Sequence, residues 1–121
     1  MTKPSMLGVA ALCLMSVTCG GGKSSPTMPS GPAGATIHIP VGASPLTTTA
    51  YVPNPVNVQV GATVTWVNDD SVPHTSTSSG GGWDSGNLPP GGRFNFTFRS
   101  AGSFNYLCLV HPNMVGTVNV Q

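Results

Sequence analysis

Short stretches in which apolar and polar residues alternate run through this chain, and they dictate an all-β fold. The clearest covers residues 93–99, where three phenylalanines take every second position with polar residues between them. Because successive side chains of a strand point to opposite faces, such alternation predicts strands with one buried face. The other predicted strands are 56–60, 63–67, 103–108 and 115–120, with weaker candidates at 36–41 and 74–78.

Clusters of Gly, Pro, Asn and Asp separate these stretches and predict turns. They lie at 53–55, 68–71, 80–82, 89–92 and 101–102. No stretch combines a helical period with helix caps. About seven short strands with regular turns predict a β-sandwich, and we expect Phe94, Phe96, Phe98 and Trp66 to fill the space between its sheets.

The start of the chain is typical of an export signal. Lys3 is followed by a mostly apolar run at 6–17, and three glycines come directly after Cys19. The run is shorter than the ~20 residues that span a membrane, so we expect residues 1–18 to be a signal peptide. The pattern resembles that of bacterial lipoproteins, in which the cysteine after the cleavage point carries a lipid. Ordinary cleavage nearby, leaving Cys19 removed or free, is the alternative.

Residues 19–35 are rich in Gly, Ser and Pro, and we expect them to form a flexible tether. This leaves residues 36–121 for one compact domain. We therefore expect an exported, monomeric protein, in the periplasm or at the cell surface, held to a membrane through Cys19.

The charge and cysteine content of the domain exclude several classes of protein. Its charged residues are two arginines and three aspartates, so it has no basic surface for nucleic acid. Cys13 lies in the signal and Cys19 is the candidate lipid site, which leaves Cys108 alone in the domain. No disulfide can form within the domain. An unprotected thiol would react in an oxidising compartment, whereas a bound metal ion would protect it.

Three potential metal ligands lie within the seven residues CLVHPNM: Cys108, His111 and Met114. A fourth, His74, follows a proline upstream. Thiolate and thioether sulfur favour Cu(I), whereas imidazole suits both oxidation states of copper. Two histidines and one cysteine with a weak axial methionine describe a blue-copper site, so the sequence predicts one copper ion held by these four residues.

Three stretches of the domain resemble plastocyanin-like cupredoxins. They are VPNPVNVQVGATVTWVNDDSVPHTSTS, WDSGNLPPG and GRFNFTFRSAGSFNYLCLVHPNMVGTVNV, which together cover most of residues 51–121. The spacing Cys-x2-His-x2-Met is similar to the short ligand loop of amicyanin-type members. The resemblance implies a cupredoxin Greek-key β-sandwich of about seven to eight strands.

The resemblance also implies roles for individual residues. His74, Cys108 and His111 would be the strong ligands of one type 1 copper, and Met114 the axial ligand. Asn68 takes the place of the family asparagine that ties the histidine segment to the ligand loop. The hydroxyl of Thr75 could bond to the strand that carries Cys108. His38 matches no ligand position, and we expect a structural or surface role for it.

These features favour a one-electron carrier over two other functions. A multicopper enzyme needs additional histidines for further copper sites, and the chain has three in all. A copper storage or delivery protein of the periplasm or cell surface is the alternative, but such proteins use open sites rich in Met and His. The methionines other than Met114 lie in the signal and tether.

Relatives exchange electrons through an apolar patch above the histidine ligand of the loop, here His111. Redox partners would then dock at this patch. Its expected rim consists of Leu46, Val72, Pro73, Pro112 and Asn113.

Overall fold

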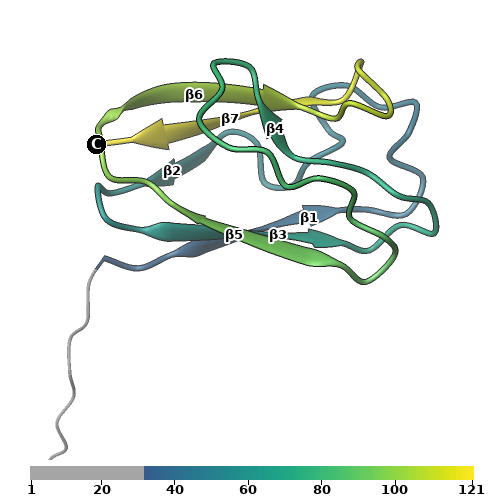
Figure 1. The fold of residues 1–121 in the computed structure, drawn as a ribbon, viewed down its shortest axis with the longest axis horizontal. Helices are drawn as coiled ribbons and strands as arrows, with labels where there is room; N and C mark the ends of the chain where they lie inside the picture. The colour runs from purple at the N-terminus through teal and green to yellow at the C-terminus, as the bar shows by residue number, and fades with distance from the viewer. Residues whose placement is uncertain (1–31) are drawn as a thin grey trace, which may run out of the picture. The chain divides into compact units, whose positions relative to one another are not determined.

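Two β-sheets packed face to face contain the strands of residues 32–121, the part of the chain that the computed structural model describes (Figure 1). The strands are β1 (Ala35–Ile39), β2 (Val56–Val58), β3 (Thr63–Asn68), β4 (Thr77–Ser78), β5 (Arg93–Thr97), β6 (Gly102–Leu107) and β7 (Val115–Val120). The predicted all-β sandwich is therefore confirmed. The predicted signal peptide and nearly all of the predicted tether lie outside the described residues. Among residues 32–121, no helix is long and apolar enough to cross a membrane.

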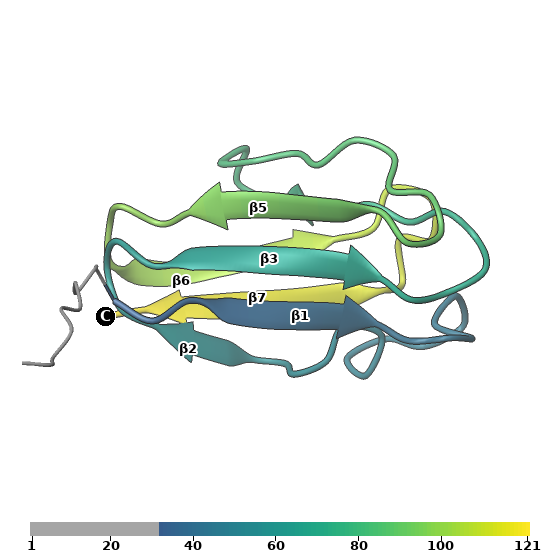
Figure 2. The same cartoon turned by 90° about the horizontal axis from the view of Figure 1, so that it is seen from below.

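The strands are ordered β1-β3-β5 in one sheet and β2-β7-β6-β4 in the other. The pairs β1–β3 and β2–β7 are parallel, and the remaining neighbours are antiparallel. Figure 2 shows the three-stranded sheet in front, with the ends of β1, β3 and β6 at the same end of the sandwich. The loops that follow β3 and β6 carry the predicted metal ligands, so this topology brings them to one end.

Trp66 lies at the centre of the core, fully buried on β3. Its ring contacts those of Tyr106, at a centroid distance of 5.4 Å, and Trp83, at 5.6 Å. Trp83 comes from the loop between β4 and β5, where no alternation marked a core residue. Of the three predicted core phenylalanines, Phe98 is buried, whereas Phe94 and Phe96 are only partly buried.

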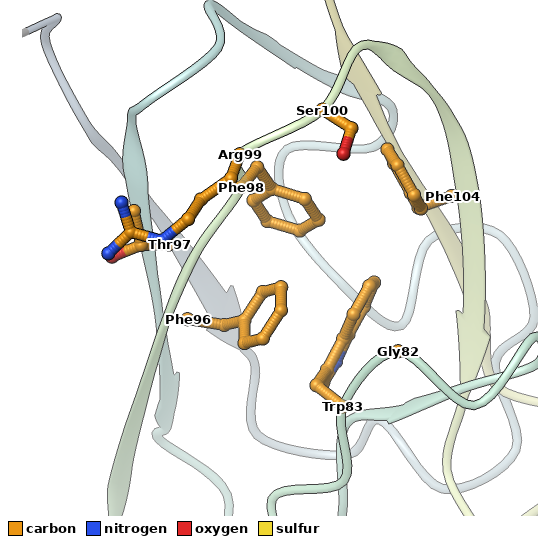
Figure 3. Close-up of a pocket in the computed structure, with 8 residues that line it drawn as sticks. All are labelled: Gly82, Trp83, Phe96, Thr97, Phe98, Arg99, Ser100 and Phe104. Carbon is orange, nitrogen blue, oxygen red and sulfur yellow. The ribbon is translucent and has the colours of Figure 1, made fainter.

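Phe96 is partly exposed because it lines an open cavity of about 290 Å³ (Figure 3). Figure 3 shows the rings of Phe96, Phe98, Phe104 and Trp83 around it, while the Arg99 side chain points away from the rings. None of the predicted metal ligands lines the cavity. It is therefore separate from the candidate site.

Gly116 marks the place where β7 comes so near the core that a side chain has no room. It pairs with Tyr106 on β6, and a Cβ atom at this position would overlap the Tyr106 ring. The glycine thus lets the buried tyrosine lie beneath the strand that closes the ligand loop.

Candidate metal centre

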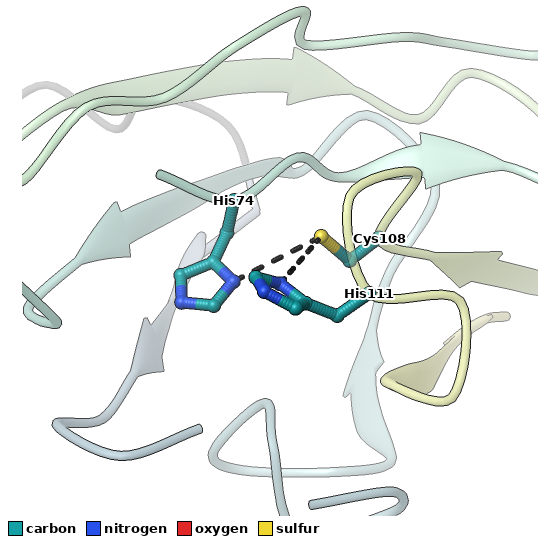
Figure 4. Close-up of side chains that lie close together, drawn as sticks. All are labelled: His74, Cys108 and His111. Atoms are coloured by element: carbon teal, nitrogen blue, oxygen red, sulfur yellow. Dashed lines mark hydrogen bonds between the residues drawn. The ribbon is translucent and has the colours of Figure 1, made fainter. Parts of the chain in front are cut away.

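Three of the predicted ligands meet at the end of the sandwich. The potential ligand atoms of His74, Cys108 and His111 all lie within 4.8 Å of one another. The Sγ atom of Cys108 is 3.8 Å from Nδ1 of His74 and 3.9 Å from Nδ1 of His111 (Figure 4). Both imidazole rings thus present the same nitrogen to the sulfur.

These separations fit one metal ion placed between the three atoms. With bonds of about 2.0 Å to nitrogen and about 2.3 Å to sulfur, a shared ion holds the two atoms roughly 3.5–3.7 Å apart at angles between tetrahedral and trigonal. The observed distances of 3.8 and 3.9 Å lie just above that range, so a small inward movement of the ligands completes the site. The donor set is the one that copper takes in trigonal His2Cys sites.

His74 is fully buried and is held by its backbone and by its ring. Its N–H and carbonyl exchange two hydrogen bonds with Leu88, of 3.1 and 2.8 Å. Its Nε2 lies 2.8 Å from Oδ2 of Asp70, which leaves Nδ1 facing Cys108. The ring therefore has one nitrogen for the carboxylate and one for a metal.

Asp70 is a residue that the sequence analysis missed. It is buried, and the hydrogen bond with His74 is the main cause that lowers the pKa of its carboxyl to about 2; the N–H of Gly42 adds to the effect. The sequence could have indicated this role, because the second ring N–H of a histidine ligand commonly donates a hydrogen bond to a carboxylate. Asp70 lies four residues before a predicted histidine ligand.

Cys108 directly follows β6, and its side chain is fully buried. The N–H of Thr75 donates a hydrogen bond of 3.3 Å to its sulfur. Its own N–H donates to the carbonyl of Met114 at 3.1 Å, and the N–H of Met114 donates to the carbonyl of His111 at 2.9 Å. The structure thus places Met114, the predicted axial ligand, fully buried in the same closed loop.

Thr75 connects this loop to the rest of the site. Its hydroxyl accepts a hydrogen bond of 2.9 Å from the N–H of Leu109, next to Cys108, as predicted. Its carbonyl accepts a 2.6 Å bond from the hydroxyl of Tyr51, whose pKa is raised chiefly by burial. Tyr51 therefore remains a donor, and Thr75 links the sulfur, the loop and the core.

The predicted role of Asn68 is wrong. Its amide donates to the carbonyls of Val72 and Leu88, both at 2.9 Å, and its side-chain oxygen accepts the N–H of Asp70. Asn68 therefore ties the turn before His74 to the Leu88 segment. The reason is local, since an asparagine at the end of a strand readily bonds the backbone two residues on.

Another side chain anchors the ligand loop instead. Asn113 donates hydrogen bonds to the carbonyls of Ser44 and Leu46, of 2.9 and 2.7 Å. The sequence analysis placed Asn113 only on the rim of a docking surface. His38, expected to lie outside the site, does so, half-exposed and 2.6 Å from a carboxylate oxygen of Asp69.

Exposed apolar residues lie close to His74 and His111 in the sequence. We use "apolar patch" for the exposed residues next to the histidines in the two loops: Val72, Pro73, Leu109, Val110 and Pro112. The largest exposed fractions among its aliphatic residues are those of Leu109, at 57%, and Val110, at 50%. These two were absent from the predicted rim, and Leu46, which was part of it, packs partly against the core. His111 itself is partly exposed.

The sequence matches the family of copper binding proteins described as plastocyanin/azurin over residues 41–121. It is 34% identical to amicyanin from Paracoccus versutus over 76 residues, which cover 59% of this chain and 58% of the amicyanin. It is 31% identical to plastocyanin from Scenedesmus fuscus over 89 residues, covering 59% of this chain and 86% of the plastocyanin. The chain thus spans less than two thirds of the length of the amicyanin.

Solved structures are similar as well. A purple cupredoxin from Nitrosopumilus maritimus superposes with a TM-score of 0.67 at 40% identity, covering 72% of this chain and 99% of that one. A variant amicyanin in its Cu(I) form superposes with a TM-score of 0.61 at 26% identity, covering 73% and 82%. These similarities agree with the two-sheet arrangement described above.

The hydroxyl of Thr75 yields a direct test of how the ligand loop is held. Thr75→Val keeps the shape of the side chain but removes the acceptor for the N–H of Leu109. We expect the free energy of unfolding of the copper-free protein, measured by denaturant titration, to fall by about 1 kcal/mol. Thr75→Ser keeps the hydroxyl and is the matched control. Equal losses in the two variants would contradict a role for this hydrogen bond.

Proposed function

Because this chain belongs to the plastocyanin/azurin family of copper binding proteins, we propose that it is a one-electron carrier that uses a single type 1 copper. The observation that carries the proposal is the cluster of His74, Cys108 and His111, in which both Nδ1 atoms face the sulfur. These three residues are the strong ligands, and Met114 is the axial ligand. A His2Cys set with a weak axial methionine serves electron transfer in proteins.

The protein contributes a rigid, largely buried environment to this chemistry. Bound copper supplies the one-electron couple between Cu(II) and Cu(I). Cys108 and His74 are fully buried, and their backbones are bonded to Met114 and Leu88. Such ligands move little when the charge of the centre changes. His111 is partly exposed and provides the short path to the surface.

Two other functions have less support. Within residues 32–121 there is one cluster of three or more histidine, cysteine or acidic side chains placed to hold a metal, whereas a multicopper enzyme needs more. A storage or delivery protein remains the second candidate. The buried sulfur and the closed loop of the described domain argue against ready exchange of the metal.

Redox partners dock at the apolar patch. Two of its exposed residues, Val110 and Pro112, flank His111 in the sequence, and no residue between β6 and β7 is charged. Apolar surface with few charges favours contact without strong electrostatic steering.

The protein is exported and tethered to a membrane through a lipid on Cys19. Support for this comes from the sequence, with its short apolar run and the Gly/Ser/Pro-rich residues that follow. The segment lies outside the described residues. A tether would let the domain reach partners away from the membrane surface.

The copper site is tested by its colour and its potential. The copper-loaded protein should show an intense visible band and reversible voltammetry, and Cys108→Ala should lose the band because residues 32–121 contain no other thiol. Met114→Gln should keep the metal but lower the reduction potential, since a harder donor favours Cu(II). Met28→Gln, in the predicted tether, is the control. A visible spectrum unchanged by Cys108→Ala would refute the proposal, and rapid copper release without reversible voltammetry would favour delivery.

Docking at the apolar patch is tested by electron self-exchange between two copies, measured by NMR line broadening. Leu109→Glu should slow the exchange by roughly tenfold or more, because two like charges then meet in the encounter. Val60→Glu is the matched control, since Val60 is an exposed valine between β2 and β3, at the other end of the sandwich. The wild-type rate should change only a few-fold from low to moderate salt. A steep dependence on salt would reveal a charged docking surface instead.

Anchoring is tested by fractionation of the full-length chain expressed in a bacterium. The protein should sediment with membranes and be released by detergent, with a mass increase on Cys19. Cys19→Ser should become soluble, whereas Cys13→Ser, within the predicted signal, should still sediment. Membrane association that survives Cys19→Ser would rule out this anchor.

A further inference from the structure

One buried carboxylate touches the candidate metal centre without belonging to its ligand set. Oδ2 of Asp70 lies 2.8 Å from Nε2 of His74, and the Asp70 side chain is 4% exposed. Its other oxygen, Oδ1, accepts the N–H groups of Gly42 at 3.0 Å and Ser71 at 2.8 Å. The carboxylate therefore has fixed partners on both oxygens.

This arrangement decides which nitrogen of His74 carries the proton. A neutral imidazole has one N–H donor and one acceptor nitrogen. Because Oδ1 receives two backbone donors, Oδ2 is left to accept from Nε2. The lone pair of Nδ1 then points toward Cys108, where a metal ligand is needed. The opposite tautomer would place a proton on Nδ1 and remove His74 as a ligand.

The backbone around Asp70 keeps the carboxylate in place. Its N–H donates to the side-chain oxygen of Asn68 at 2.9 Å, and the Asn68 amide is bonded to Val72 and Leu88. Leu88 in turn exchanges backbone hydrogen bonds with His74. The carboxylate and the imidazole are therefore held by one connected set of bonds and cannot turn independently.

We propose that Asp70 is a positioning residue that holds His74 as an Nδ1 ligand and, as a buried negative charge, lowers the reduction potential of the centre. The inference rests on the proposed function of a type 1 copper site. Reduction adds one electron, supplied by a redox partner, to Cu(II) and gives Cu(I), without proton transfer between Asp70 and His74. A nearby anion in a poorly solvated environment stabilises the more positive oxidised state more strongly.

The neighbouring residue provides a matched control. Asp69 carries the same charge one position earlier, and its Oδ2 lies 2.6 Å from Nδ1 of His38. Its side chain is 47% exposed, and its histidine partner is not a predicted ligand. Solvent screens this charge, so removing it should affect the centre far less.

The test compares Asp70→Asn with Asp69→Asn in the copper-loaded protein. An asparagine at position 70 keeps the shape but lacks the charge, and it cannot accept all three donors. Asp70→Asn should weaken Cu(II) binding relative to Cu(I) by tenfold or more, and each tenfold change raises the potential of a one-electron couple by ~59 mV. Asp69→Asn should change this ratio less than about threefold, within the range for a screened surface charge.

A second measurement does not depend on how well the Asp70 variant folds. In the Cu(I)-loaded wild type, NMR of the histidine rings should show a slowly exchanging, downfield proton on Nε2 of His74. This proton should persist in Asp69→Asn. Rapid exchange of the Nε2 proton in the wild type would overturn the inference, as would equal potentials in the two variants.

The two proposals can fail separately. If the wild type and Asp69→Asn show the visible band and Asp70→Asn has the same potential, the role of Asp70 is refuted and the copper site stands. If the wild type itself lacks the band, the proposed function fails and the inference fails with it.

Discussion

The pairing of β6 with β7 is the constraint on which the metal centre depends. Leu107 pairs with Val115, so residues 108–114 must close between two hydrogen-bonded strands. The hydrogen bond from the N–H of Cys108 to the carbonyl of Met114 joins the first and last residues of this loop. A loop this short has little conformational freedom, and the backbone therefore brings Cys108 and His111 together before any metal binds. In the same strand pair, Gly116 of β7 lies directly against the ring of Tyr106 of β6.

The remaining ligand comes from the connection between the two sheets, and hydrogen bonds of the next residue join that connection to the ligand loop. His74 lies between β3 of the three-stranded sheet and β4 of the four-stranded sheet, whereas Cys108 follows β6 in the four-stranded one. Thr75 bridges them, since its N–H reaches the sulfur, its hydroxyl accepts from Leu109 and its carbonyl accepts from Tyr51. The bonds to the sulfur and from Tyr51 are buried, and there an unmatched partner costs about 1–3 kcal/mol. The site is thus rigid because the same bonds stabilise the fold.

Much of the fold and of the candidate site could be predicted, and the failures share a cause. Alternation located the long strands, and donor chemistry pointed to four residues for copper. Prediction failed where a residue acts through partners distant in sequence. Asn68 bonds Leu88 rather than the ligand loop, and Trp83 reaches the core from a loop without periodicity. Local sequence patterns could predict neither the Asn68–Leu88 hydrogen bond nor the burial of Trp83, because both depend on how distant segments pack together.

The sequence by itself determined the class of the fold, the donor atoms and the scarcity of charge, since these follow from residue types and from the two-residue period of a strand. Only the tertiary structure decided which nitrogen of each imidazole faces Cys108 and that Asp70 lies behind His74. Ring orientation is set by hydrogen bonds to groups elsewhere in the chain, such as the N–H of Gly42 that helps hold the carboxylate. Those bonds exist only once the loops at one end of the sandwich have come together.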